Sequence, residues 1–353
     1  MVAQTRRMMP PIEYVRLSDE AAGLDGIIAI HSTARGPAAG GCRLWTYDDP
    51  EAAMRDAFRL AEGMSYKNAM ARLPLGGGKA VLRRPAGDFD RPEVRRALFE
   101  AFGEAVEKLD GRYVTAEDVG TGVSDMEYVA LHTRHVAGRT ALPGLAGGDP
   151  SPWTALGVFE AMKAAVEFRY GSGLAGVTVA ISGVGNVGAG LARLLHGAGA
   201  QLVVADIDPL RCARLAEETG ARIMGIDGIA AIEAEVFAPC ALGGALDDAT
   251  VEALRAKVVC GAANNQLAAP HVAEMLMERG IAYAPDYVAN AGGIINVAAE
   301  YLGESENEVR GRVMAIGPRM RELLDTAASD GLPPPVVADR MAEELMRPEM
   351  VAA

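Results

Sequence analysis

The stretch Val177–Asp206 limits what this 353-residue chain can fold into more than any other part of its sequence. It begins with a β-branched run, Val177–Ser182, which leads directly into the pattern Gly-x-Gly-x-x-Gly at Gly183–Gly188. A helical pattern follows, and then a second strand pattern, Gln201–Ala205, which ends in Asp206. This order of strand, glycine turn, helix, strand and acid is that of a βαβ unit that binds a dinucleotide.

Each glycine of this turn has a separate physical task. We expect Gly183 to form the tight turn, Gly185 to admit a pyrophosphate to the helix N-terminus, and Gly188 to allow close packing of helix and strand. Asp206 would accept hydrogen bonds from ribose hydroxyls and repel a 2′-phosphate, which favours NAD over NADP. A glycine-rich turn without a ligand is the alternative, and it leaves Asp206 unexplained.

Further strand patterns alternate with helical patterns at residues 221–226, 235–242, 257–263 and 281–288. This alternation is typical of a doubly wound parallel sheet, so the predicted fold class is α/β. Asn264 and Asn265 follow one of these strands, on the side where such sheets bind ligands. Their amides can bind nicotinamide, ribose or substrate.

The rest of the chain predicts strands with tight turns over residues 12–48, helices over 91–109 and 124–136, and a short strand before Glu117. Residues 139–152, rich in glycine and proline, are the predicted linker. The C-terminal part predicts helices over 309–328 and 335–346.

Two lysines, Lys67 and Lys79, stand in the otherwise almost uncharged stretch Gly63–Leu82. Lys67 lies near the end of a helical pattern. Three glycines, Gly76–Gly78, are expected to form a turn before Lys79, which opens a short buried strand. A buried lysine is costly to keep charged, and a second cation nearby adds to that cost, so such a lysine can accept a proton near neutral pH.

Two other interpretations of this stretch are weaker. Ordinary surface lysines would stand among charged residues, whereas the flanks here are Met, Tyr, Ala, Leu and Gly. A phosphate-binding P-loop needs glycine where this chain has Leu73, and Ser or Thr where it has Ala80.

Several other polar positions have a functional and a plain interpretation. Asp118 ends a strand just before Gly120, where loops present catalytic groups, although an acid there can also cap a helix. His132 and His135 stand three apart without further metal ligands, which favours a solvated helix face. The pair Gly40-Gly41, considered alone, favours a turn.

Composition narrows the partners and the compartment. The formal net charge is −13, which argues against nucleic acid or an anionic membrane as a partner. The four cysteines are scattered without a Cys-x-x-Cys pair, and the N-terminus lacks a secretory apolar run. We therefore expect a cytoplasmic protein with reduced thiols, no bound metal and small-molecule partners.

With these residues considered together, the chain resembles the glutamate/leucine/phenylalanine/valine dehydrogenase family, and most of all its leucine-specific members. The similarity runs nearly end to end. It is carried by GGCRLWTYDDPEAA, GMSYKNAMARLPLGGGKAV, GRYVTAEDVGTGVSDM, SGVGNVG, APCALG, GAANNQL and YAPDYVANAGGIINVAAE.

The resemblance implies a two-domain α/β fold, an N-terminal substrate and assembly domain plus a Rossmann-type NAD domain, with the active site in the cleft. The implied bounds are 1–140 for substrate binding, catalysis and oligomerisation, 141–328 for NAD binding, and 329–353 for a C-terminal helix that returns to the first domain. It also implies a homo-oligomer. The cofactor-binding residues that we expect are Gly183, Gly185, Asn186, Val187, Gly188, Asp206, Thr154, Ala262, Asn264 and Asn265.

The resemblance assigns chemical roles as well. Lys67 matches the lysine that pairs with the substrate α-carboxylate, assisted by Gly40, Gly41 and Met64. Lys79 matches the lysine that activates water. Asp118 matches the carboxylate that handles the amine proton, and Asn264 an asparagine near nicotinamide and substrate. The implied reaction is reversible oxidative deamination of an L-amino acid to its 2-oxo acid and ammonia.

The expected side-chain pocket is apolar and consists of Ala39, Ala116, Ile294 and Val297. Glutamate-specific relatives carry a lysine where this chain has Ala39, so an acidic side chain would be buried without a partner. This favours a branched-chain substrate. Because Ala39 is smaller than the leucine expected there, phenylalanine is an alternative. A 2-hydroxy acid dehydrogenase is a weaker alternative, since no histidine stands near a motif expected in the cleft. A catalytically inactive NAD-binding regulator is also weaker, since Lys67, Lys79 and Asp118 are all retained.

Overall fold

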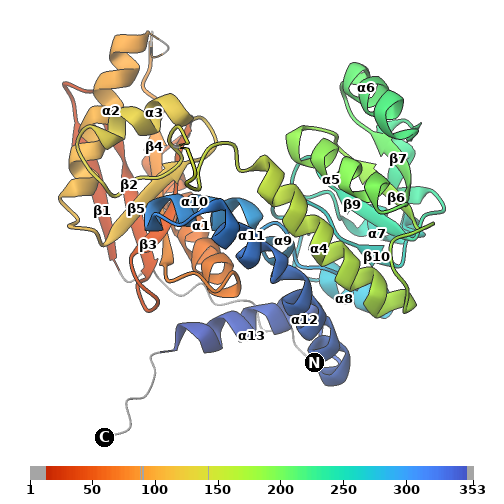
Figure 1. Cartoon of the computed structure of the whole chain (residues 1–353). Helices are drawn as coiled ribbons and strands as arrows, with labels where there is room; N and C mark the ends of the chain where they lie inside the picture. Colours follow the sequence, from red (N-terminus) through yellow and green to blue (C-terminus); the bar gives the residue numbers. More distant parts are fainter. Residues whose placement is uncertain (1–12, 88, 90, 142, 348–353) are drawn as a thin grey trace, which may run out of the picture. The chain divides into compact units, whose positions relative to one another are not determined.

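The computed structural model describes residues 13–87, 89, 91–141 and 143–347 (Figure 1). The chain forms two compact units. The first contains the chain up to Asp149, Asn296–Val309 and the chain from Ala342 on, and the second contains Pro150–Ile295 and Arg310–Met341. The domain bounds expected from the sequence stay a prediction, and their outer ends, residues 1–12 and 348–353, lie outside the described residues.

The first unit is built on a mixed five-stranded sheet with the order β1-β2-β4-β3-β5. β1 and β4 pair antiparallel with β2, whereas β3 pairs parallel with both β4 and β5. The strands are β1 (Glu13–Asp19), β2 (Leu24–Ser32), β3 (Ala38–Trp45), β4 (Gly76–Arg83) and β5 (Tyr113–Glu117). The helices in this part of the chain are α1 (Pro50–Met70), α2 (Pro92–Glu107) and α3 (Val123–Ala130), joined later by parts of α10 (Gly292–Leu302), α11 (Glu306–Met314) and α13 (Pro334–Met346).

Side-chain alternation along the strands gives this sheet two different faces. On one face Ala29 and Val81 pack against small residues of α1, such as Ala57 and Ala61. On the other face Ile28 and Leu82 belong to the core that α2 and α3 complete. The two cores place α1 opposite α2 and α3, with the sheet between them (Figure 1).

The glycine clusters of this unit are strand residues, which corrects the expectation of turns. Gly40 and Gly41 are buried in β3, and Gly76–Gly78 are the first residues of β4. A Cβ on Gly40 would lie 1.9 Å from the carbonyl oxygen of Gly78, and one on Gly77 would lie 2.1 Å from the backbone nitrogen of Ser65 in α1. Glycine is required here because strand and helix backbones approach too closely for side chains.

The second unit contains a six-stranded, fully parallel sheet with the order β11-β10-β9-β6-β7-β8. This is the predicted doubly wound sheet. The chain adds β7 and β8 on one side of β6, then returns and adds β9, β10 and β11 on the other side, so the strand order reverses between β6 and β9. The strands are β6 (Thr178–Ser182), β7 (Gln201–Ala205), β8 (Arg222–Ile223), β9 (Val236–Pro239), β10 (Val258–Val259) and β11 (Ala282–Tyr283). The helices are α4 (Ser151–Tyr170), α5 (Asn186–Gly197), α6 (Pro209–Thr219), the 3₁₀ helix η1 (Ile226–Ala231), α7 (Asp248–Ala253), α8 (Val272–Glu278), α9 (Asp286–Ala289) and α12 (Ile316–Asp330).

Two predicted helices have different bounds in the structure. The helix expected over 124–136 ends at Ala130, because the chain beyond it pairs with β5: Thr115 donates to the carbonyl of His135, and Ala137 donates to that of Thr115. The helix expected over 309–328 is interrupted at Ala315. Pro318 explains the break, since its ring would clash with the carbonyl of Met314 in a continuous helix.

Among the described residues, no helix is both long and apolar enough to cross a membrane.

Candidate active site

The site in the first unit begins with a row of residues across the sheet. Ala29 of β2 pairs with Lys79 of β4, and Gly41 of β3 pairs with Ala116 of β5. The register of β3 against β4, in which Ala39 pairs with Gly77, sets Gly41 beside Lys79. Because Ala29 packs on α1, the side chain of Lys79 lies on the same face of the sheet as that helix.

Lys79 is almost fully buried, at 5% exposure, and its charge is paired. Its Nζ lies 2.9 Å from Oδ2 of Asp118, the residue that follows β5. A Cβ on Gly41 would lie 2.9 Å from the Cβ of Asp118 and 2.5 Å from the carbonyl oxygen of Glu117. The bare backbone of Gly41 therefore leaves the space in which Lys79 reaches Asp118.

The two neighbouring acids Glu117 and Asp118 have opposite electrostatic surroundings. Burial raises the pKa of the Asp118 carboxyl, but Lys79 and Arg43 lower it more, so this pKa falls below its ordinary value. Burial raises the pKa of Glu117, and the nearby acids Asp149 and Glu300 raise it further. The surroundings thus favour the ionised form of Asp118 and disfavour that of Glu117.

Arg43 is a site residue that the sequence analysis missed. Its Nε donates to Oδ2 of Asp118 at 3.0 Å, and its Nη1 donates to Oδ2 of Asp56 on α1 at 3.0 Å. The signal was present, since Arg43 is two residues after Gly41 on one strand, so its side chain lies on the face of the sheet where Gly41 leaves space. Arg43 thus binds the same carboxylate oxygen as Lys79.

Lys67 lies in the last turn of α1 and is half-buried. One turn earlier, Met64 approaches β3, because a Cβ on Gly40 would lie 3.1 Å from its Cγ. Next to Lys67, the Asn68 amide donates to the carbonyl of Gly76 at 2.6 Å and fixes α1 on the sheet. The structure thus places Met64 next to Gly40. Binding of the substrate α-carboxylate by Lys67 stays a prediction.

The predicted pocket residues fall into two sets. Ala39 and Ala116 are buried in β3 and β5, at 5% and 6% exposure. Ile294 and Val297 are half-buried and one turn apart on α10, the helix within which the chain passes from the second unit to the first. That these two residues complete the pocket stays a prediction.

In the second unit the glycine turn has the predicted geometry. Gly183 has a φ of +101°, which favours glycine, and a Cβ there would lie 2.7 Å from the backbone nitrogen of Ala241. A Cβ on Gly188 would lie 2.1 Å from the carbonyl oxygen of Gly183. Among the described residues, a Cβ on Gly185 would come within 4 Å of Arg211 alone, at 3.7 Å, so the space in front of α5 is open there.

This turn fits the dinucleotide that the pattern predicts. Among the described residues no side chain caps α5, so the N–H groups of its first residues, Asn186 and Val187, could bind a phosphate. The Asp206 carboxylate accepts hydrogen bonds from the N–H groups of Val184 at 2.7 Å and Asp208 at 2.9 Å. These bonds fix the carboxylate and leave it further lone pairs for ribose hydroxyls.

The asparagines expected near the nicotinamide follow β10. Asn264 and Asn265 are exposed, and Asn265 has a left-handed φ of +52°. Asn290, buried at 3% exposure and missed by the sequence analysis, donates to Oδ1 of Asn264 at 2.8 Å and to the carbonyl of Ala262 at 3.1 Å. The Asn264 amide is thereby oriented with its NH₂ group away from Asn290.

The remaining predicted positions have structural partners. Thr154, in the first turn of α4, donates to the carbonyl of Pro150 at 2.9 Å. His135 does not lie on a solvated helix face as expected: it is buried at 6% exposure and its Nδ1 lies 3.1 Å from the hydroxyl of Tyr301. The described residues contain no group of three or more His, Cys, Asp or Glu placed to hold a metal ion.

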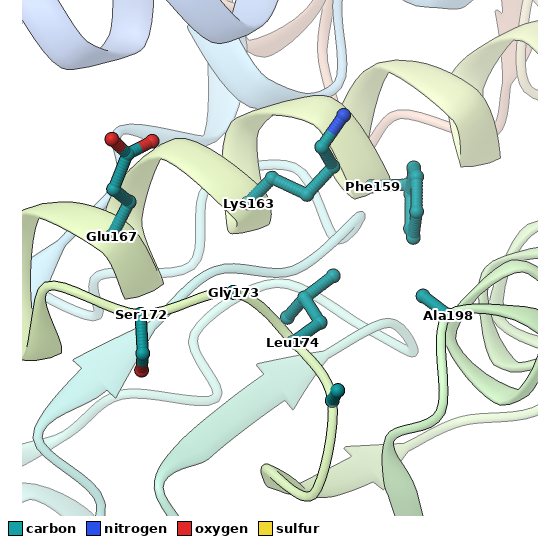
Figure 2. Close-up of a pocket in the computed structure, with 8 residues that line it drawn as sticks. Phe159, Lys163, Glu167, Ser172, Gly173, Leu174 and Ala198 are labelled. Carbon is teal, nitrogen blue, oxygen red and sulfur yellow. The ribbon is translucent and has the colours of Figure 1, made fainter.

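A cavity of about 320 Å³ in the second unit lies away from this chemistry. Figure 2 shows residues of its wall, to which α4 contributes Phe159 and Lys163 and the segment before β6 contributes Leu174. Its loop residues precede β6 and Ala198 follows α5. The cavity therefore lies near the amino-terminal end of β6, whereas the glycine turn follows the carboxyl-terminal end of that strand. We assign no ligand to it.

A parallel doubly wound sheet with this turn, in a chain that also carries a buried lysine–carboxylate pair, defines a nicotinamide-dependent dehydrogenase. Two family models match the chain: "Glu/Leu/Phe/Val dehydrogenase, dimerisation domain" over residues 7–135, and "Glutamate/Leucine/Phenylalanine/Valine dehydrogenase" over 149–209 and 210–330. The protein belongs to this family of amino acid dehydrogenases, which are oxidoreductases. The resemblance inferred from its motifs is thereby confirmed.

Individual relatives agree with the family models. The leucine dehydrogenase of Bacillus subtilis is 46% identical over 96% of this chain and 93% of its own length. The valine dehydrogenase of Streptomyces albus is also 46% identical, over 95% of this chain and 92% of its own length. Among solved structures, the L-tryptophan dehydrogenase from Nostoc punctiforme superimposes with a TM-score of 0.85 at 38% identity and covers 97% of both chains.

Proposed function

We propose that the protein catalyses the NAD-dependent, reversible oxidative deamination of a branched-chain L-amino acid to its 2-oxo acid and ammonia. The single observation that carries this proposal is the buried contact of 2.9 Å between Lys79 and Asp118 beside Gly41. A buried amine on an ionised carboxylate is a proton donor and acceptor held in place, as the chemistry of an amine substrate and water requires. The similarity to leucine and valine dehydrogenases supports the reaction class.

In the proposed mechanism each residue moves or holds a defined group. Lys67 binds the substrate α-carboxylate, next to Gly40, Gly41 and Met64. Asp118 takes a proton from the substrate ammonium, which leaves the amine lone pair free to assist loss of hydride from Cα. The bound nicotinamide supplies the acceptor for that hydride. Lys79 then deprotonates a water that adds to the substrate iminium, and the carbinolamine collapses to 2-oxo acid and ammonia.

The pocket residues favour a branched aliphatic side chain. Ala39, Ala116, Ile294 and Val297 are all apolar, and none offers a charge to a substrate carboxylate. Burying that carboxylate would cost more than the roughly 2–7 kcal/mol of an unpaired neutral polar group. One methylene changes discrimination by only about 1–3 kcal/mol, so several aliphatic substrates should be accepted. Phenylalanine is the competing substrate, because the small side chain of Ala39 leaves room for a phenyl ring.

The cofactor preference and the assembly follow from different parts of the chain. Asp206, fixed by Val184 and Asp208, favours NAD because a 2′-phosphate would meet its negative charge.

The match to a dimerisation domain supports a homo-oligomer. The placement in the cytoplasm stays a prediction.

The test is a substrate panel with the purified protein. NADH formation is followed at alkaline pH with leucine, isoleucine, valine, phenylalanine and glutamate, and with NADP in place of NAD. We expect the highest kcat/KM with a branched-chain substrate and NAD. A rate with glutamate above the others would contradict the pocket assignment, and no turnover of any amino acid would contradict the proposed function.

A further inference from the structure

Two cations share a single oxygen of Asp118. Lys79 Nζ lies 2.9 Å and Arg43 Nε 3.0 Å from the same Oδ2 atom. The carboxylate is thus held in one orientation by two donors that come from different strands, β4 and β3. Of the two donors, only lysine can release a proton in a protein, since the guanidinium of arginine stays charged.

Arg43 is itself held from the side of α1. Its Nη1 donates to Oδ2 of Asp56, which also accepts from the hydroxyl of Tyr47 at 2.6 Å. The Nη2 of Arg59 lies 2.7 Å from the other Asp56 oxygen. Burial raises the pKa of Asp56, but these three partners lower it more, and the net shift is downward. Asp56 is therefore an ionised anchor that fixes the position of Arg43.

We propose that Arg43 is a positioning residue of the dehydrogenase reaction: it orients the Asp118 carboxylate and keeps it paired with a positive charge when Lys79 releases its proton. The proposal rests on the proposed function. Without Arg43, a proton lost from Lys79 would leave a largely buried carboxylate without a cationic partner, which is costly. With Arg43 the deprotonated lysine and the ionised carboxylate can coexist before substrate reacts, which is the state in which both proton acceptors of the proposed mechanism are ready.

Other charged and titratable groups around the pair do not replace this charge. Asp125 of α3 is bound by Arg95 at 2.6 Å. Burial raises the pKa of Cys42 and of Tyr113, which keeps both groups neutral. Lys67 on α1 has the task of binding the substrate carboxylate in the proposed mechanism. Arg43 is thus the fixed cation assigned to Asp118 throughout the reaction.

The test is the pH dependence of kcat/KM in Arg43→Gln. Arg43 is one of the cations that lower the pKa of Asp118, and a carboxyl that loses a neighbouring cation holds its proton more tightly. We expect the ascending limb of the profile to move to higher pH by about one unit, and kcat near neutral pH to fall about tenfold and partly recover at higher pH. Arg43→Lys keeps the charge but lacks the guanidinium that bridges the carboxylates of Asp56 and Asp118. The ascending limb of its pH profile should therefore stay near that of the wild type while kcat falls severalfold.

The matched control is Arg55→Gln, because Arg55 is an exposed arginine of α1 whose salt bridge is to Glu51. Its profile should coincide with that of the wild type. An ascending limb that does not move in Arg43→Gln, in a wild-type protein that is an active amino acid dehydrogenase, would overturn the role of Arg43 alone. A wild type without amino acid turnover would overturn the proposed function instead. If Arg43→Gln does not fold, a wild-type kcat in Arg43→Lys would refute the positioning role.

Discussion

The Nζ atom of Lys79 reaches Oδ2 of Asp118 at 2.9 Å although their strands, β4 and β5, are separated by β3. Gly41 lies between them in the sheet and has no side chain to obstruct the contact. The catalytic pair that we propose thus depends on a glycine as much as on the two charged residues.

Lys79→Ala should bind NADH with wild-type affinity and lose turnover by a factor of about 10²–10⁴, the usual contribution of a positioned acid–base group. Asp118 keeps Arg43 as a partner at 3.0 Å, so the fold should persist. NADH binding by fluorescence and kcat by absorbance measure the two properties. A near-normal kcat would contradict the role assigned to Lys79.

Gly41→Ala should lose activity and stability together. Its Cβ would lie 2.5 Å from the carbonyl oxygen of Glu117 and 2.9 Å from the Cβ of Asp118, so Asp118 must move away from Lys79. Overpacking of this kind costs about 1–3 kcal/mol, which thermal unfolding would detect. Wild-type kcat in this variant would show that Asp118 does not need its present position.

Gly63→Ala is the control for the glycine prediction. Gly63 is exposed in the interior of α1, and a Cβ there meets no atom within 4 Å among those described. Alanine is the better helix former, so stability should rise by about 0.5–1 kcal/mol. The midpoint of thermal unfolding should therefore shift in opposite directions for the two Gly→Ala variants.

Asp206→Asn should weaken the preference for NAD. The variant loses the charged acceptor for ribose hydroxyls, a hydrogen bond worth about 1.5–3 kcal/mol, and the repulsion of a 2′-phosphate. The ratio of kcat/KM for NAD to that for NADP should fall about tenfold or more. kcat with saturating NAD should change little, because Lys79 and Asp118 are intact. An unchanged ratio would argue against Asp206 as the ribose ligand.

Glu300 should make stability depend on pH. Its carboxylate accepts from the N–H groups of Gly138 at 2.8 Å and Arg139 at 3.1 Å, yet burial dominates and raises its pKa. A raised pKa means that the stability contribution of Glu300 is present below its unfolded pKa, about 4.3, and is lost as pH rises through the folded pKa. Relative to Glu300→Gln, the wild type should thus lose stability between about pH 4 and pH 8. The unfolding midpoints of the wild type and of Glu300→Gln at both pH values measure this. A wild type that gains stability relative to Glu300→Gln as the pH rises would contradict the prediction.

The sequence predicted the second unit well because its signals are local. The strand Gln201–Ala205 has the predicted bounds, and Gly183 has the left-handed backbone that the turn pattern requires. The predictions that failed concern local structure that contacts with distant segments of the chain determine. The helix after Ser124 ends early because residues beyond Ala130 pair with β5, and Gly40–Gly41 form a buried strand because β4 and α1 pack against them.

By itself the sequence determined the α/β class and the dinucleotide turn, because each follows from a residue pattern of short range. The roles of Lys67, Lys79 and Asp118 come from the family resemblance and stay predictions. Tertiary structure decided which cation binds Asp118: Arg43 and Lys79 are far apart in sequence and meet on one oxygen because β3 and β4 pair in parallel register. It also decided that Asn290 orients Asn264. Such contacts depend on strand order and register, which distant parts of the chain fix together.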